Sequence, residues 1–258
     1  MPGHTNHNGL ALRPKDIFQG SLCRGAAILD EGMASRFSTI IDKPVTVFPE
    51  TTDQRMPGQA AGRVLEERLK RFADGRPVVG LFGHLRKSKG VLPLLLASRH
   101  PKMSDVCFAF GGEMVWGSFT SNESQIVRDI LTNGANTWNH LLRIPDEEQL
   151  NSVLSACDIL YLGYLDFPHS SGLMTKAALL HKPLIVSDGY LMAERVRRFK
   201  LGEVVPQGDV DALVDGITKI TCNTKAWVAE NQPRWSDYGC EHSFERLKEA
   251  FREIFNRL

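Results

Sequence analysis

The chain of 258 residues is 42% hydrophobic and 24% charged, a composition typical of a globular protein with one large or two small domains. Its 31 Lys and Arg residues nearly balance its 30 Asp and Glu residues, which leaves a formal net charge of +1. This balance excludes a global attraction to nucleic acid or to an anionic membrane, so any anion binding has to be local.

The cysteines and the N-terminal segment favour a reducing compartment. The five cysteines are odd in number and form no C-x-x-C pair, which favours reduced thiols over a disulfide framework or a zinc site. Residues 1–16 are polar and rich in Gly, Pro, His and Asn, which predicts a disordered tail and differs from a signal peptide. No apolar run reaches the roughly 18 residues that a membrane span requires. We therefore expect a cytoplasmic protein without a transmembrane segment.

The pattern of apolar residues within 17–76 predicts a short strand at 26–29, a helix at 31–41 and a second strand at 44–48. A helical pattern follows at 59–72, and an Asp-Gly-Arg-Pro sequence behind it ends that pattern. This is too little chain for an independent domain, so we expect a new domain to begin at residue 77.

Residues 77–234 alternate short apolar runs with amphipathic helical patterns. Continuous apolar strands between such helices imply a parallel sheet covered on both faces, which is an α/β, Rossmann-like, doubly wound domain. A helical stripe within 235–258 predicts a C-terminal helix. The apolar runs lie at 78–82, 106–110, 140–142, 159–162, 184–186 and 203–205, and the helical patterns at 91–98, 123–132, 147–157, 173–180 and 192–199.

Two loops of this domain carry the groups of an anion site. The loop after the first strand holds Arg86, Lys87 and Lys89, and a Ser-Ser-Gly turn at 170–172 opens the helical pattern at 173–180. Ligands of such sheets sit at the carboxyl ends of the strands, and backbone N–H groups at a helix start bind phosphate. Two plainer interpretations stay open. The charged side chains of the first loop are alternatively exposed to solvent without a ligand, and a serine of the second loop alternatively only caps the helix that follows.

Sequence motifs of other enzyme classes do not occur. The loop at 83–90 is not a Walker A sequence, because Arg86 stands where its second glycine would be, and no G-x-G-x-x-G follows the first strand. These observations disfavour an NTPase or a nicotinamide enzyme, and no G-x-S-x-G nucleophile elbow exists. Asp209 and Asp211 open a helical pattern, which indicates helix capping rather than a metal site.

Several short motifs occur in a fixed order: G-x-L-x-x-x-K-G at 83–90, Gly-Gly at 111–112, Leu-Ser-Ala-Cys-Asp at 154–158, Ser-Ser-Gly at 170–172, Lys-Pro-Leu-Ile-Val-Ser-Asp at 182–188 and Leu-Gly-Glu-Val-Val at 201–205. In this order they resemble the C-terminal, donor-binding half of GT-B glycosyltransferases, most closely those of family 4. The resemblance covers 77–220. Residues 29–49 are similar to the end of the family's N-terminal half, so most of the acceptor half is missing.

The resemblance implies binding of a nucleoside-diphosphate sugar, a UDP- or GDP-hexose, whose sugar is transferred to an acceptor that the sequence does not identify. Lys89 matches the family's diphosphate lysine, and its charge would stabilise the leaving diphosphate without a metal ion. Ile144 falls where family members contact the base through backbone groups. The implied donor-site residues are Gly83, Arg86, Lys89, Gly112, Ile144, Ser170, Ser171 and Gly172.

Three positions depart from the family's pattern. His84 stands where the family has an arginine five residues before the lysine, so one fixed charge is lost unless a neighbouring cation replaces it. Pro168 and Lys176 stand where the family has paired glutamates. The second glutamate accepts hydrogen bonds from ribose hydroxyls, which an ammonium group cannot do. The catalytic residue is unknown, with His84 and His169 as candidates.

Other functions stay open beside glycosyl transfer. Without an acceptor half, the chain is alternatively a non-catalytic nucleotide-sugar binding module or a fragment of a longer enzyme. A sugar-nucleotide epimerase on the same fold would need acid–base groups in the cleft, for which the candidates are His84, His169, Asp166 and Glu113. The apolar stripe of the C-terminal helix predicts exposure or self-association.

Overall fold

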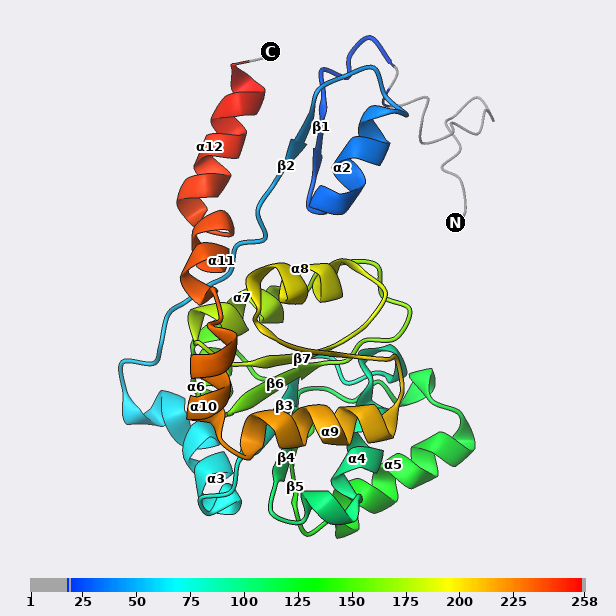
Figure 1. The fold of residues 1–258 in the computed structure, drawn as a ribbon, viewed down its shortest axis with the longest axis vertical. Helices are drawn as coiled ribbons and strands as arrows, with labels where there is room; N and C mark the ends of the chain where they lie inside the picture. Colours follow the sequence, from blue (N-terminus) through cyan, green and yellow to red (C-terminus); the bar gives the residue numbers. More distant parts are fainter. Residues whose placement is uncertain (1–17, 19, 257–258) are drawn as a thin grey trace. The chain divides into compact units, whose positions relative to one another are not determined.

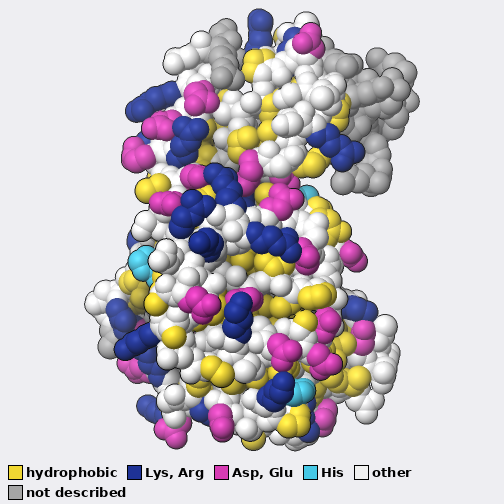
Figure 2. Space-filling view, in the orientation of Figure 1, with side chains coloured by type: hydrophobic (Ala, Val, Ile, Leu, Met, Phe, Trp, Pro, Cys, Tyr) yellow, Lys and Arg dark blue, Asp and Glu magenta, His cyan; other side chains and the backbone are white. Residues whose placement is uncertain are grey.

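A computed structural model describes Phe18 and residues 20–256, so the tail predicted at 1–16 lies outside the described residues. By its internal contacts the described chain divides into a larger unit, Thr52–Gly239, and a smaller unit that combines residues up to 51 with residues from 240 onward. None of the described helices is long and apolar enough to cross a membrane. Basic and acidic side chains alternate over the face shown in Figure 2, in keeping with the net charge of +1.

The described part of the smaller unit contains the predicted strand–helix–strand, with β1 (Ala26–Ile28), α2 (Glu31–Ser38) and β2 (Val45–Val47). The two strands pair in parallel. Helix α12 (Phe244–Phe255) belongs to the same unit, and the ring of Phe251 lies 4.7 Å from that of Phe48, next to β2. Other phenylalanines of α12 are exposed. Self-association through this helix stays a prediction.

Residues 52–239 form a six-stranded parallel sheet in the order β5-β4-β3-β6-β7-β8, flanked by helices (Figure 1). The order reverses between β3 and β6, which is the pattern of a doubly wound sheet. The predicted Rossmann-like α/β fold is confirmed. The strands are β3 (Val78–Phe82), β4 (Cys107–Gly111), β5 (Thr137–His140), β6 (Ile159–Leu162), β7 (Leu184–Ser187) and β8 (Gly202–Val205).

Two hydrophobic clusters lie on opposite faces of this sheet, because alternate strand residues point to opposite sides. Helices α3, α6, α7 and α8 cover one face, and α4, α5, α9 and α10 cover the other. The helices are α3 (Val64–Ala73), α4 (Val91–Ser98), α5 (Ser121–Asn133), α6 (Glu147–Ser155), α7 (Gly172–Leu179), α8 (Leu191–Phe199), α9 (Val210–Thr221), α10 (Thr224–Asn231) and α11 (Trp235–Glu241), with short 3-10 turns η1 (Ala60–Arg63), η2 (Lys87–Lys89), η3 (Pro101–Met103) and η4 (Trp116–Ser118).

Two boundaries differ from the sequence-based expectation. The larger unit begins at Thr52 and not at residue 77, because α3 buries Leu65 and Leu69 in the cluster that covers one face of the sheet. Strand β5 spans Thr137–His140 rather than 140–142. Its polar residue Thr137 fits a buried strand because its hydroxyl donates to the carbonyls of Ile130 and Gly134, so apolarity alone placed the strand too late.

Candidate functional site

Two glycines bring the loops after β3 and β4 together at the carboxyl edge of the sheet. Gly83 has φ +100° and Gly112 has φ +125°, conformations that L side chains rarely adopt. A Cβ atom at Gly112 would lie 2.0 Å from the carbonyl oxygen of Gly83, so only glycine permits this approach. The Gly83 N–H also donates to the Gly111 carbonyl at 2.9 Å. These two glycines form the floor of a pocket.

The pocket has a volume of about 480 Å³ and lies over the ends of β3, β4 and β5 and the start of α6. It contains four of the residues predicted for the site, namely Gly83, His84, Gly112 and Ile144. Ile144 lies in the loop after β5, beside the carboxyl ends of the neighbouring strands. The remaining lining residues are Glu113, Arg143, Pro145, Asp146, Glu147 and Leu150.

Lys89 does not line this pocket, but it lies beside Gly83, which does. Its ammonium lies 3.8 Å from the position that a Cβ atom of Gly83 would occupy. It donates to the hydroxyl of Tyr164 at 3.1 Å and lies 4.7 Å from the centre of the same ring. The Tyr164 hydroxyl is 3.2 Å from the Ser171 hydroxyl. One buried tyrosine therefore joins the two loops that the sequence analysis singled out, at the point where the strand order reverses.

Close backbone packing holds the Lys89 loop in place. Gly90 has φ +72°, and a Cβ atom there would lie 2.2 Å from the carbonyl oxygen of Gly163. The Leu165 N–H donates to the Ser88 carbonyl at 2.8 Å. The loop after β3 and the loop after β6 are thus bound to each other by their main chains, which fixes Lys89 opposite Tyr164.

The start of α7 is open. Ser171 occupies the N-cap position, but its side chain makes no capping hydrogen bond to the described residues. In the described part of the chain, nothing lies within 4 Å of the Cβ position at Gly172. Capping of α7 by the Ser171 side chain is therefore wrong, and the first N–H groups of a helix have no carbonyl partner within the helix itself.

The two serines of the turn have different surroundings. The Ser170 hydroxyl accepts a hydrogen bond of 2.6 Å from the guanidinium of Arg195, a side chain that is only 1% exposed. Ser171 contacts Tyr164 instead. Ser171 and Lys89 thus lie together, whereas Ser170 is held by a buried cation from α8.

The cations of the β3 loop do not act as one cluster. Lys87 pairs with Glu123 at 2.7 Å, and the Lys87 ammonium and the Thr120 N–H lower the pKa of the Glu123 carboxyl by hydrogen bonding to it. Arg86 is exposed and does not line the pocket. Of the loop's three cations, Lys89 is the one fixed beside Gly83 among the described residues.

Lys176 stands at one of the two glutamate positions of the family's pattern, and three groups hold its ammonium. Its side chain is buried, and its ammonium contacts Glu147 at 2.8 Å, Asn151 Oδ1 at 2.7 Å and the Asp53 carbonyl at 2.8 Å. These contacts use its three donor hydrogens. Sequence reasoning recorded Lys176 only as a departure and missed Tyr164 and Glu147, although Tyr164 directly follows a strand at the switch point.

Comparison with known proteins gives the fold. No protein-family model matches the sequence, and no curated protein matches it. Sucrose-phosphate synthase from Thermosynechococcus elongatus aligns over 95% of this chain and 61% of its own, with a TM-score of 0.69 and 17% identity. HepE from Anabaena, in complex with UDP and glucose, aligns over 90% and 63%, with a TM-score of 0.68 and 17% identity. WaaG, a glycosyltransferase involved in lipopolysaccharide biosynthesis, aligns over 93% and 64%, with a TM-score of 0.64 and 14% identity.

The chain has a GT-B glycosyltransferase fold. It spans less than two thirds of the length of each of these proteins, and identities this low bear on the fold alone. Membership of family 4 and the missing acceptor half stay predictions. The larger unit is one Rossmann-like half of the GT-B fold, and the pocket lies where ligands of such sheets bind.

The histidines named as catalytic candidates lie in different settings. Both side chains are exposed, but His84 lines the pocket, whereas His169 does not line it and packs edge-on against Phe167 with 5.4 Å between ring centroids. His140 is the last residue of β5, and burial, with a smaller effect of the Arg68 charge, lowers its pKa below the usual range. Among the described residues, no group of three or more His, Cys, Asp or Glu side chains is placed to hold a metal ion.

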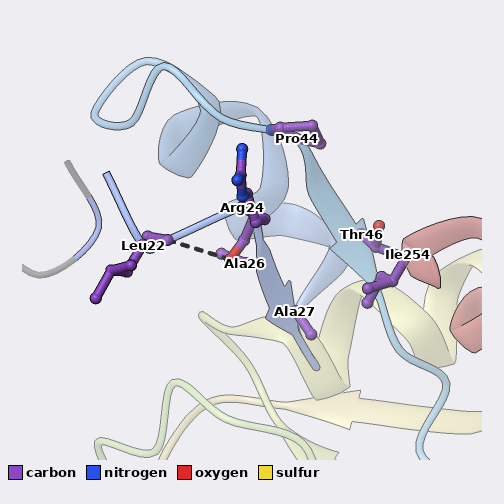
Figure 3. A pocket seen from close by; sticks show the side chains of 9 residues that line it. Leu22, Arg24, Ala26, Ala27, Pro44, Thr46 and Ile254 are labelled. Carbon is purple, nitrogen blue, oxygen red and sulfur yellow. Dashed lines mark hydrogen bonds between the residues drawn. The ribbon is translucent and has the colours of Figure 1, made fainter. Parts of the chain in front are cut away.

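A second pocket, of about 420 Å³, lies within the smaller unit (Figure 3). It is bordered by β1 and β2 and by Ile254 of α12, and Arg24 is the charged residue among those that line it. It lacks the glycine loops and the helix start of the first pocket. The candidate site is therefore the pocket at the carboxyl edge of the larger sheet.

Proposed function

We propose that the larger unit binds a nucleoside-diphosphate sugar, a UDP- or GDP-hexose, at the pocket over β3, β4 and β5. The observation that carries this proposal is the chain of contacts from Lys89 through Tyr164 to Ser171, beside the open start of α7. A fixed ammonium and free N–H groups at a helix start form a site for a diphosphate. The nucleoside would extend from there over Gly112 to Ile144.

We further propose that the chain takes part in transfer of the hexose to an acceptor. Cleavage of the sugar–phosphate bond leaves negative charge on the diphosphate, and Lys89 with the α7 N–H groups would stabilise that charge without a metal ion. The UDP and glucose held by HepE, which shares the fold, support UDP-glucose as the first donor to try. His84 and His169 remain the catalytic candidates.

Calorimetric titration with UDP, GDP and UMP, in EDTA and again in Mg²⁺, tests the donor site. We expect UDP or GDP to bind at least tenfold more tightly than UMP, with little effect of Mg²⁺. Lys89→Met should abolish this preference for the diphosphate. Lys87→Met is the matched control, because Lys87 pairs with Glu123 in the same loop and should leave the preference intact. Absence of binding by every nucleotide at millimolar concentration would refute the donor site.

A second candidate function is nucleotide-sugar binding without transfer. It is favoured by Lys176, whose ammonium is fully used by Glu147, Asn151 and Asp53, and by Pro168 at the other glutamate position. Incubation with radiolabelled UDP-glucose separates the two functions. Release of labelled glucose, or transfer to a mixture of sugar and lipid acceptors, supports transfer. Tight binding with an intact donor after long incubation supports the binding module.

A further inference from the structure

The pocket carries two adjacent carboxylates at the start of α6, and they are not equivalent. Asp146 is the N-cap of α6: one oxygen accepts from the Gln149 N–H and the other from the Gln149 side-chain amide, both at 2.8 Å. Both oxygens of Asp146 are therefore engaged in the helix cap. Glu147, the next residue, also lines the pocket, but its contacts are of another kind.

Glu147 is anchored through one oxygen. Its Oε2 lies 2.8 Å from the ammonium of Lys176, which is itself buried and held by Asn151 and by the Asp53 carbonyl. Two described groups other than Glu147 thus hold Lys176, and Lys176 fixes Glu147 in turn. A glutamate held by a buried, immobile cation loses little side-chain entropy when it binds a ligand.

The other oxygen of Glu147 is available. Oε1 has no hydrogen-bond or ion-pair partner among the described residues, and the side chain is 51% exposed. A carboxylate in this state accepts hydrogen bonds from two neighbouring hydroxyl groups, because each oxygen has two lone pairs. Glu147 lines the pocket together with Ile144 and Pro145, which lie in the loop proposed to contact the nucleoside, whereas Lys89 is not among the lining residues.

We propose that Glu147 recognises the 2′,3′-diol of the ribose of the bound nucleotide, with Lys176 as its positioning residue. This inference rests on the proposed nucleotide site. The diol-accepting carboxylate then comes from the first turn of α6, and the helix α7 supplies a cation that orients it. A lysine at position 176 is in this way compatible with ribose recognition, although lysine itself accepts no hydrogen bond.

The experiment compares UDP with 2′,3′-dideoxy-UDP by calorimetric titration of the full chain. The unmodified protein should bind UDP about tenfold more tightly than the dideoxy nucleotide. Glu147→Ala should remove this difference by weakening UDP alone. Glu147→Gln keeps an oxygen that can accept from Lys176, so it preserves the local fold, and it should lower the preference as well.

Glu148→Ala is the matched control. Glu148 lies in the same helical turn and does not line the pocket, and its ion-pair partner is Arg55 at 3.8 Å. It should keep the full preference for UDP. Lys176→Met should reduce the preference by loosening Glu147, with the affinity for the dideoxy nucleotide unchanged.

The outcomes separate the two proposals. If the unmodified protein binds neither nucleotide, the proposed donor site is refuted, and this inference with it. If it binds UDP and both Glu147 variants keep the preference over the dideoxy nucleotide, the donor site stands and Glu147 is not the diol acceptor. Equal weakening of both nucleotides by Glu147→Gln would assign Glu147 a structural role and also overturn the inference.

Discussion

The hydroxyl of Tyr164 offers the sharpest test of how the anion site is organised. Tyr164→Phe removes one atom that joins Lys89 at 3.1 Å and Ser171 at 3.2 Å, and it keeps the ring beneath the ammonium. A hydrogen bond to a charged group contributes about 1.5–3 kcal/mol, and the retained cation–π contact about 0.5–1 kcal/mol. Because Lys89 is only half-buried, water recovers part of the loss, so we expect unfolding to become easier by about 1 kcal/mol.

The same substitution should weaken diphosphate binding. Without its hydroxyl partner, Lys89 samples more rotamers and has to be ordered by the ligand, at a cost of about 0.5–1.5 kcal/mol for one long side chain. This corresponds to a dissociation constant for UDP raised about 2- to 12-fold, with UMP much less affected. Calorimetric titration at two salt concentrations measures it, and urea unfolding measures the stability.

Tyr161→Phe is the control for this prediction. Tyr161 is buried in the cluster on the opposite face of the sheet, and its hydroxyl donates to the Gly163 carbonyl at 3.3 Å. The control should lower stability to a similar degree and leave the affinity for UDP unchanged. Equal affinity for UDP in Tyr164→Phe and the unmodified protein would show that Tyr164 does not organise the site.

Three further changes have defined outcomes. Gly112→Ala should abolish nucleotide binding and lower the melting temperature, whereas Gly117→Ala, at an open position with no positive φ, should do neither; a functional Gly112→Ala protein would contradict the close approach to Gly83. Leu94→Ala should cost about 2–5 kcal/mol of unfolding free energy in urea titrations, since the side chain is fully buried, and a loss below about 1 kcal/mol would contradict its place in the core. The pKa of the Glu123 carboxyl is lowered in the folded protein, so its contribution to stability is complete above the ordinary value of 4.5 and is lost as pH falls through the lowered value. In Glu123→Gln, the free energy of unfolding in urea should therefore fall less between pH 7 and pH 3 than it does in the unmodified protein.

Local features of the chain were readable from the sequence. Asp146 caps α6 by accepting a hydrogen bond from the N–H of Gln149, three residues further along the chain. Asp209 caps α9 through the Ala212 N–H, as predicted in place of a metal site. Caps of this kind depend on residues only a few positions apart in the chain.

The sequence by itself determined the alternation of strands and helices, and hence a parallel sheet whose glycine loops gather at one edge. Hydrogen bonds within a helix and the two-residue period of a strand act over short distances along the chain, so apolar patterns report them directly. Only the tertiary structure decided which loops meet. Lys89 contacts Tyr164, 75 residues further along the chain, because β3 and β6 are neighbours in the sheet, and Lys176 reaches the Asp53 carbonyl across 123 residues. Strand order and helix packing set such contacts, and no local pattern encodes them.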